Sequence, residues 1–293
     1  VISGGEPFCR KDIAEIVSRA SEYFGDKALI VTNGTLITDE LAEHLAQSRI
    51  DVQISLEGPD EESNDAIRGK GVFGKALKTI RKLKSLGLTP LVRMTLLKSN
   101  VNKVREIMEF VNREGLGAVV LGTLQMSGRA HEFLRKIDPT TDELIKAYRE
   151  IRKLDPDSAF IKFGENIRPA VTRGEKLDLC GAGTGILSIG ADGGVYPCPG
   201  LMYPEFLAGN IREKSLEEIW KESSVLKEIR CLSVSKIPGC KDCSIRYLCG
   251  GGCLVDIFWE HGNLYGKTPR CEFLRAMKWD ELKRTAYEKK QMR

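Results

Sequence analysis

"GCKDCSIRYLCGGGC", residues 239–253, places four cysteines close together near the end of a 293-residue chain. Cys180, Cys198 and Cys231 precede this stretch and Cys271 follows it, so that eight of the nine cysteines come after residue 179. No export signal is recognisable in this sequence, so we expect a reducing compartment, where clustered cysteines bind metal more often than they form disulfides. The sequence therefore predicts a C-terminal part that is organised around metal.

The spacing of these cysteines bears on the kind of metal site. A structural zinc site takes four ligands, commonly from two CxxC pairs, whereas here the CxxC of Cys240 and Cys243 is followed by gaps of five and three residues. Iron–sulfur clusters take four thiolates each, and seven or eight cysteines suffice for two. The spacing favours iron–sulfur clusters, with zinc and other uses left open.

Composition excludes several classes of protein. The net charge is +4, from 45 basic and 41 acidic residues, and such a balance gives no reason to expect a nucleic acid or a membrane surface as partner. No run approaches the roughly 18 apolar residues of a membrane span, and no signal peptide is recognisable. We expect a cytoplasmic protein. Its first residue is Val and lies in a strand-like stretch, so we also expect a cut N-terminus.

The first half of the chain alternates between short apolar runs and amphipathic segments. This alternation predicts a parallel sheet covered by helices, either doubly wound or part of a β/α barrel. After the opening Val1–Ser3, strands are expected at 27–32, 51–58, 90–97 and 117–122, and helices at 11–24, 38–47, 72–86 and 101–113.

Polar and glycine residues gather where these strands end, and ligands of parallel α/β folds bind at the carboxyl ends of strands. Ordinary turns are the alternative for each of them. In "GGEP" the proline holds Glu6 extended, beside two glycines that let a ligand approach. The stretches in question are Gly4-Gly5-Glu6-Pro7, Thr32-Asn33-Gly34, Ser55 and Gly122.

From residue 179 onward the alternation stops. The stretch "CGAGTGILSIGADGGVYPC", residues 180–198, has an Asp-Gly-Gly turn within an alternating segment, which predicts a hairpin with a cysteine at each end. A short helix is expected at 215–220.

Taken together, these motifs resemble the radical S-adenosylmethionine (SAM) enzymes that carry a C-terminal SPASM domain. That domain has the pattern C-x(9–15)-G-x4-C, then C-x2-C-x5-C-x3-C, then C, and every fixed interval agrees here. "GGEP", "TNGT", "SLEGPD…IRG" and "SGRA" at 127–130 look like the family's barrel landmarks in the family's order.

The resemblance implies a fold and a domain division. We expect an α/β chain with a partial (β/α)6 barrel over 1–155 that lacks its first β/α unit, and a linker over 156–179. A small cysteine-rich SPASM domain is expected over 180–275, followed by a C-terminal helix over 276–293.

The resemblance also implies two auxiliary 4Fe–4S clusters. The outer one would be held by Cys240, Cys243, Cys249 and Cys271, and the inner one by Cys180, Cys198 and Cys253. Some relatives supply a fourth inner ligand six residues after the first cysteine, where this chain has Ile186. The inner cluster is therefore expected either to keep an open iron or to recruit Cys231, for which a buried free thiol is the alternative.

For SAM, the resemblance implies a set of barrel residues. The amino group of SAM would be contacted by the GGEP turn, that is, by Gly4, Gly5 and Glu6 with Pro7. The ribose and the carboxylate of SAM would be bound by Ser55 and Arg68. Gly122 would let the adenine approach. Glu57 stands where the family has Asp, and the family's His is missing, which weakens the role of Arg68. We give His44, His131 and His261 no catalytic role.

The CxxxCxxC motif that holds the family's primary cluster does not occur, and Cys9 is single. We therefore expect the primary 4Fe–4S cluster only with an N-terminal segment that this sequence lacks. Without it the chain is expected to be inactive and to have an exposed, aggregation-prone sheet edge.

The implied activity starts with cleavage of SAM to a 5′-deoxyadenosyl radical, with a reductant such as ferredoxin or flavodoxin as partner. We favour modification of a peptide or protein side chain by a ribosomal-peptide maturase. The alternatives are an anaerobic sulfatase-maturing enzyme, a relative that modifies a tetrapyrrole side chain, and a non-catalytic iron–sulfur electron-transfer module. Pro199 argues against the sulfatase interpretation, because that group has Asp directly after the hairpin's second cysteine.

Overall fold

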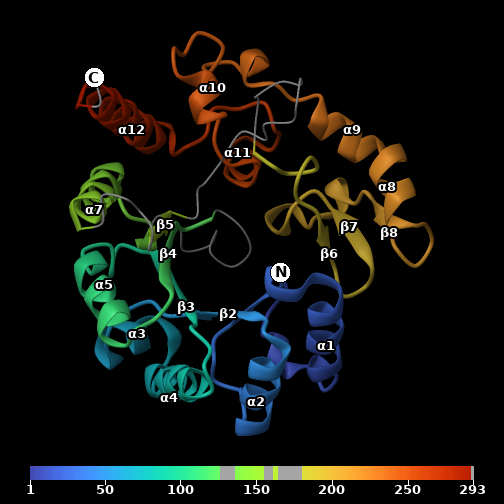
Figure 1. Ribbon diagram of the computed structural model, residues 1–293. Helices are drawn as coiled ribbons and strands as arrows, with labels where there is room; N and C mark the ends of the chain where they lie inside the picture. The colour runs from blue at the N-terminus through green and yellow to red at the C-terminus, as the bar shows by residue number, and fades with distance from the viewer. Residues whose placement is uncertain (126–135, 155–160, 164–179, 292–293) are drawn as a thin grey trace. The chain divides into compact units, whose positions relative to one another are not determined.

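The computed structural model describes residues 1–125, 136–154, 161–163 and 180–291 (Figure 1). The "SGRA" stretch, His131 and most of the expected linker lie outside these residues. The chain forms two compact units: Val1–Leu124 with Lys136–Gly164, and Gln125–Arg135 with Glu165–Arg293. No helix in the described part is both long and apolar enough to cross a membrane.

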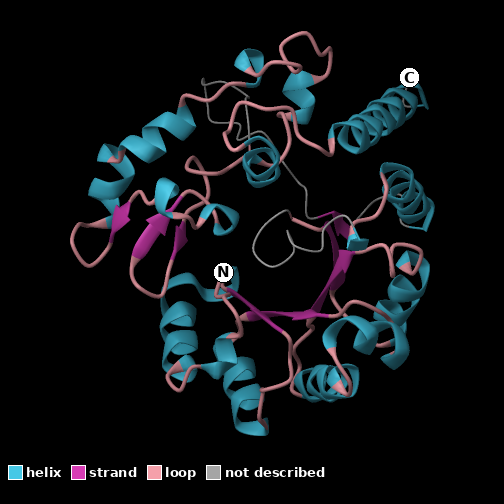
Figure 2. Cartoon of the chain, turned by 180° about the vertical axis from the view of Figure 1, so that it is seen from behind, coloured by secondary structure: helices cyan, strands magenta, loops and turns pink. Residues whose placement is uncertain are grey.

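A curved parallel sheet forms the centre of the first unit, with its strands side by side in sequence order (Figure 2). The four strands expected after residue 26 are confirmed. The strands are β1 (Leu29–Thr32), β2 (Asp51–Ser55), β3 (Leu91–Leu96), β4 (Ala118–Thr123) and β5 (Ile161–Phe163). The expected strand at the start of the chain is reduced to one bridge, in which Ile2 pairs with Ile30 at the outer edge of β1.

Strand β5 corrects the expected linker. It lies within 156–179, yet Ile161 pairs with Val119 of β4, so that it belongs to the first sheet. Three residues are too few to show a strand periodicity in the sequence.

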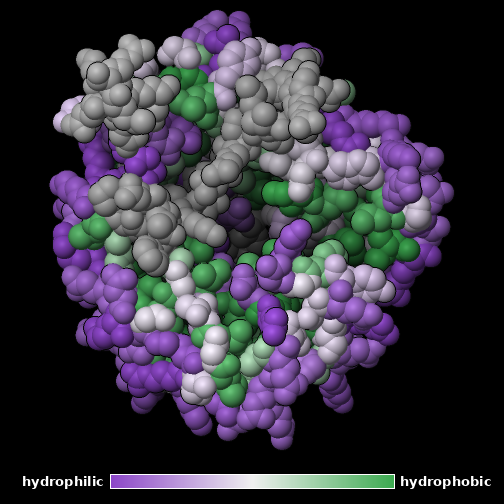
Figure 3. All heavy atoms as spheres, viewed as in Figure 1, coloured by the Kyte–Doolittle hydropathy of each residue, from purple (hydrophilic) through white to green (hydrophobic). Residues whose placement is uncertain are grey.

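Helices follow the strands of this unit, and Figure 2 shows them along one side of the sheet. They are α1 (Ile13–Phe24), α2 (Asp39–Ser48), α3 (Glu61–Arg68), α4 (Val72–Ser85), α5 (Val104–Arg113) and α7 (Thr141–Leu154), with 3-10 turns η1 (Pro7–Cys9) and η2 (Gly25–Lys27). Thr38 caps α2, with its hydroxyl oxygen accepting from the Leu41 N–H at 3.3 Å. The outward faces of α2 and α4 are largely hydrophilic (Figure 3).

The two faces of the sheet differ in polarity. Ile30, Ile54, Val92, Met94 and Leu121 share one face and are fully buried. Since side chains alternate along a strand, the residues between them point to the opposite face. That face carries Gln53, Ser55, Arg93, Thr95 and Gly122 together with the apolar Leu29, Val31, Leu91 and Val120. Because it holds the charged side chain of Arg93, we call it the polar face, and it is the face of the sheet that suits a polar ligand.

The second unit begins with a small antiparallel sheet, which confirms the expected hairpin. Its strands are β6 (Ser188–Ile189), β7 (Gly194–Tyr196) and β8 (Gly209–Asn210), with β7 in the centre. The helices that follow are α8 (Leu216–Glu222), α9 (Ser224–Arg230), α10 (Arg246–Cys249), α11 (Leu254–His261) and α12 (Cys271–Gln291), with 3-10 turns η3 (Pro199–Leu201), η4 (Pro204–Phe206) and η5 (Val234–Lys236). Helix α12 begins at Cys271 rather than at 276 as expected.

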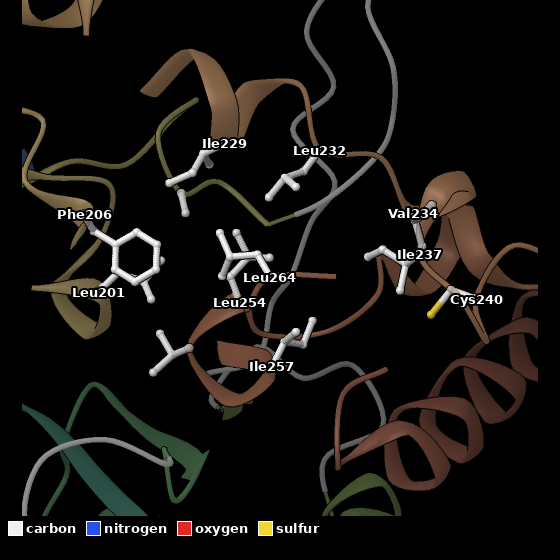
Figure 4. Close-up of a cluster of buried hydrophobic side chains, with 12 residues drawn as sticks. Leu201, Phe206, Ile229, Leu232, Val234, Ile237, Cys240, Leu254, Ile257 and Leu264 are labelled. Atoms are coloured by element: carbon white, nitrogen blue, oxygen red, sulfur yellow. The ribbon is translucent and has the colours of Figure 1, made fainter. Parts of the chain in front are cut away.

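One apolar cluster forms the core of this unit. Leu201 and Phe206 come from the segment after the hairpin, Ile229 from α9, and Leu254 and Ile257 from α11 (Figure 4). Cys240 is itself a buried member of the cluster, and Cys180, Cys198 and Cys253 pack against it. These four cysteines of the second unit are therefore part of its core packing.

Two glycine substitutions test the packing of the first unit. A Cβ at Gly58, just after β2, would lie 2.9 Å from the backbone nitrogen of Asn64, so we expect Gly58→Ala to lower the free energy of unfolding by about 1–3 kcal/mol. A Cβ at Gly74 in α4 would meet no atom within 4 Å, and Gly74→Ala is the matched control, with a gain of about 0.5 kcal/mol from helix propensity. Urea denaturation measures both, and equal effects of the two changes would contradict this packing.

Candidate cofactor sites

The GGEP turn is fastened to the end of β1 through the Glu6 side chain. Its Oε1 accepts hydrogen bonds from the Thr32 hydroxyl at 2.7 Å and from the Phe8 N–H at 3.2 Å. Its Oε2 accepts from the Asn33 N–H at 2.8 Å. Glu6 has an extended backbone, with φ −141° and ψ 114°. A carboxylate is thus held at the carboxyl end of a strand, as the sequence predicted.

Space lies open beside this carboxylate. Gly4 and Gly5 are exposed, and a Cβ on either one would meet no atom within 4 Å. Pro7 is buried and starts the η1 turn. The glycines can therefore border a ligand, while Pro7 is placed to set the conformation of Glu6.

Arg68 has a partner that the sequence did not reveal. Its Nη2 donates to Glu57 Oε1 at 2.6 Å, and Glu57 Oε2 accepts from the Thr95 N–H at 2.8 Å. Burial raises the pKa of the Glu57 carboxyl, and the charge of Arg68 opposes that rise. Arg68 Nε is buried with no hydrogen-bond partner among the described residues. The arginine is thus held by Glu57 and still has a donor left for a ligand.

Ser55 and Gly122 lie on the polar face of the sheet with a residue that we did not predict, Arg93 of β3. Ser55 pairs with Arg93 in the register of β2 and β3. The Arg93 guanidinium lies over Gly122, since a Cβ there would come within 2.9 Å of its Nη2. The charge of Arg93 also acts on Glu57. Gly122 therefore makes room for an arginine, and the alternation of β3, with Val92 and Met94 buried, is the sequence signal that would have shown Arg93 on this face.

The predicted inner cysteines form one electrostatic group. Burial raises the pKa of Cys180, Cys198 and Cys253, and the charge of Cys180 acts on both of the others. Nearby backbone N–H groups oppose this rise in pKa: those of Ala182 and Leu254 at Cys180, Gly200 and Leu201 at Cys198, and Val255 and Asp256 at Cys253.

The predicted outer cysteines form a second group. Burial raises the pKa of Cys240, and the negative charges of Cys271 and Cys243 raise it further. Burial raises the pKa of Cys249 as well; the charges of Cys271, Cys240 and Cys243 add to that rise, and the nearby Gly251 N–H opposes it. Cys240, Cys243, Cys249 and Cys271 thus lie close enough to influence one another.

These two sets fit iron–sulfur clusters in their chemistry. Cys240 is buried and the other six thiols are half-buried, and partial burial with polar backbone groups nearby is the kind of surroundings that tunes such clusters. Within the described residues, no three His, Cys, Asp or Glu side chains gather closely enough for a single metal ion. A 4Fe–4S cluster occupies more space than one ion and is compatible with this wider spacing.

Two cysteines stand apart from the sets. Cys9 and Cys231 are exposed, so the buried free thiol considered for Cys231 is not observed. Ile186, at the position of the fourth inner ligand in some relatives, is 48% exposed.

Comparisons with known proteins agree with the two units. Residues 1–111 match the model of the radical SAM superfamily, and residues 180–244 match that of the SPASM iron–sulfur cluster-binding domain. The mycofactocin maturase MftC of Mycolicibacterium smegmatis is 34% identical over 279 residues, which cover 92% of this chain and 69% of that protein. The chain belongs to the radical SAM enzymes with a SPASM domain. An AdoMet-dependent heme synthase of Nitratidesulfovibrio vulgaris is 28% identical over 93% of this radical SAM chain and 78% of its own length.

Solved structures show the same fold. The structure of native anSMEcpe with bound AdoMet has a TM-score of 0.77 and 17% identity, covering 99% of this chain and 84% of its own. Streptococcus suis SuiB bound to S-adenosylmethionine has a TM-score of 0.73 and 21% identity, covering 92% of this chain and 65% of its own. The predicted family and α/β fold are confirmed.

The Glu57–Arg68 pair gives a test of this site's framework. The Glu57 side chain is 7% exposed and that of Arg68 25%, and removing one partner of such a pair leaves a poorly solvated charge. We expect Glu57→Gln to lower the free energy of unfolding by about 3 kcal/mol, measured by urea denaturation. Arg10→Gln, which breaks the exposed Arg10–Asp12 pair, is the control and should leave the unfolding midpoint unchanged. An unshifted midpoint for Glu57→Gln would show that the pair does not hold the site.

Proposed function

We propose that this protein is a ribosomal-peptide maturase that uses SAM to modify a peptide or protein side chain. The observation that carries the proposal is the similarity to mycofactocin maturases, at 34% identity over 92% of the chain. Among proteins of the same fold, one SuiB structure contains the precursor peptide SuiA. These similarities support a peptide as the class of substrate.

We propose the following cluster ligands, on the basis of the two cysteine groups. The outer auxiliary 4Fe–4S cluster is held by Cys240, Cys243, Cys249 and Cys271, and the inner one by Cys180, Cys198 and Cys253. When bound, such clusters supply sites that accept or donate single electrons. Cys231 is not part of either group, so the inner cluster keeps one iron without a cysteine ligand.

For SAM, we propose the polar face and strand ends of the first unit. Glu6 pairs with the ammonium group beside Gly4 and Gly5, as a fixed carboxylate does with a cation. The carboxylate of SAM is bound by two guanidinium groups, that of Arg68 through its free Nε and that of Arg93. The ribose of SAM is bound by the Ser55 hydroxyl. Gly122 leaves room for the Arg93 side chain, in addition to any contact with the adenine. Pro7 fixes the extended backbone conformation of Glu6.

The proposal includes the conditions of activity. The sequence contains no CxxxCxxC motif, so residues 1–293 by themselves are proposed not to cleave SAM. A reductant such as ferredoxin or flavodoxin supplies the electron, and the protein acts in the cytoplasm.

Two other substrates remain as candidates for the same chemistry. A tetrapyrrole is supported by the heme synthase relatives, at lower identity than the maturases. A sulfatase is disfavoured because Pro199, after Cys198, starts the η3 turn and offers no proton acceptor. A pure electron-transfer module would have no use for the Glu6 side chain at the end of β1 and the Arg93 side chain on the polar face of β3.

The substrate is tested by binding. We expect a short precursor peptide encoded beside this gene to bind the reconstituted protein in anaerobic calorimetry, with a scrambled peptide of the same composition as control. Iron coproporphyrin serves as the competing probe. Binding of the porphyrin but not of the peptide would replace the maturase proposal by the tetrapyrrole one.

The cluster ligands are tested by iron content and spectroscopy. Anaerobically reconstituted protein should contain close to eight irons, from two clusters of four. Cys271→Ala should abolish the electron paramagnetic resonance (EPR) signal of one cluster, and Cys180→Ala that of the other. Cys231→Ala is the matched control and should leave both. If Cys271→Ala and Cys180→Ala remove the same signal, the assignment is wrong.

The SAM site is tested by affinity. Each charge-assisted hydrogen bond contributes about 1.5 kcal/mol or more, so Glu6→Gln and Arg93→Gln should each weaken SAM binding at least about tenfold in calorimetry. Arg19→Gln, on the exposed surface of α1, is the control. Unchanged affinity for both site variants would place SAM elsewhere.

A further inference from the structure

The loop that joins α11 to α12 folds back onto the residues around Cys253. His261 Nε2 is 2.8 Å from the carbonyl oxygen of Lys267. Thr268 packs on Gly252, where a Cβ would lie 2.6 Å from its Cγ2. Arg270 Nε lies 3.9 Å from Asp256 Oδ2. These three contacts hold the segment that ends in Cys271 against the segment that carries Cys253.

Asp256 places a negative charge beside the inner set. It is the third residue of α11 and is 2% exposed. Cys253 is the N-cap residue of the same helix, and the carboxylate charge of Asp256 raises the pKa of the Cys253 thiol, next in size after burial. Arg270, 7% exposed, offsets part of this charge. Because the carboxylate is shielded from water, its influence on Cys253 is only weakly screened.

Lys267 places a positive charge beside the outer set. Its side-chain stem packs over Gly239, next to Cys240, with Cδ 3.7 Å from a Cβ at that position. Its charge interacts with Cys271, which raises the pKa of Lys267, and it also acts on Cys240. Glu272, 3.6 Å from Nζ, offsets part of this charge. Lys267 is exposed, so salt weakens its influence.

We propose that Asp256 and Lys267 set unequal reduction potentials at the two auxiliary clusters. A negative charge disfavours an added electron and a positive charge favours one, so Asp256 lowers the potential of the inner cluster and Lys267 raises that of the outer one. When both clusters are bound, this difference in potential would favour the outer one as electron acceptor, and the side chains that set it are Asp256 and Lys267. The inference rests on the cluster ligands proposed above.

The test is an anaerobic redox titration of the reconstituted 293-residue protein, with each cluster followed by its own EPR signal. Asp256→Asn should raise the inner potential, changing the ratio of reduced to oxidised inner cluster about tenfold at a fixed poise, or 59 mV for one electron. Lys267→Gln should lower the outer potential, with a smaller change that shrinks further at high salt. Lys241→Gln, an exposed lysine next to Cys240 in sequence, is the matched control and should shift neither.

Asp256→Asn removes a negative charge that lies near the buried Arg270, and this change affects folding as well as potential. Iron content and circular dichroism are therefore measured on each variant to show that it is folded and holds its clusters. The double variant Asp256→Asn with Arg270→Gln removes both buried charges and should still raise the inner potential, by less than Asp256→Asn alone. Two clusters with unshifted potentials in the Asp256 and Lys267 variants would overturn the inference and leave the proposed ligands standing. A protein that forms fewer than two clusters before any substitution would instead refute the ligand assignment.

Discussion

The buried Glu57 carboxylate connects the parts of the first unit that surround its polar face. One oxygen accepts from Arg68 at the end of α3, and the other from the backbone of β3 at Thr95. The same turn is fixed by amide side chains, since the Glu57 N–H donates to Asn64 Oδ1 and its carbonyl accepts from Asn100 Nδ2. A buried charge is tolerated only with such partners. The position of Arg68, and with it the charge presented to a ligand, therefore depends on Glu57.

The second unit depends on a different constraint. Its strands contain two or three residues, and most of its helices have eight or fewer. So little regular structure leaves much of the stability to one apolar cluster, against which Cys180, Cys198 and Cys253 pack. In small domains of this kind, metal binding supplies part of the folding free energy. The same residues thus serve the fold and the proposed cofactors.

The features that the sequence predicted well are those with a fixed spacing. The cysteine intervals indicated the SPASM domain, which the family model confirms, and apolar periodicity led to the first four strands and their helices. Helix α3 could not be seen this way, because Asn64 is its only buried residue and it has no apolar stripe. Strand β5 was too short, and α12 starts at a cysteine that we had assigned only as a ligand. Arg93 was overlooked because a charged residue within an apolar strand looks like an interruption, whereas the structure shows it on the polar face. The partner of Arg68 required three-dimensional information, since Glu57 is eleven residues away.

The glycine run between Cys249 and Cys253 has a consequence for how this protein can change over time. Gly250, Gly251 and Gly252 all have positive φ, of 69°, 79° and 95°. The left-handed region costs any other residue roughly 1–2 kcal/mol, and at Gly252 the contact with Thr268 adds to that strain. One replacement here would therefore strain the backbone that positions two cysteines from different sets. Single substitutions in this tripeptide are therefore disfavoured. A change of substrate specificity is expected to come from substitutions at other positions, with the three glycines retained.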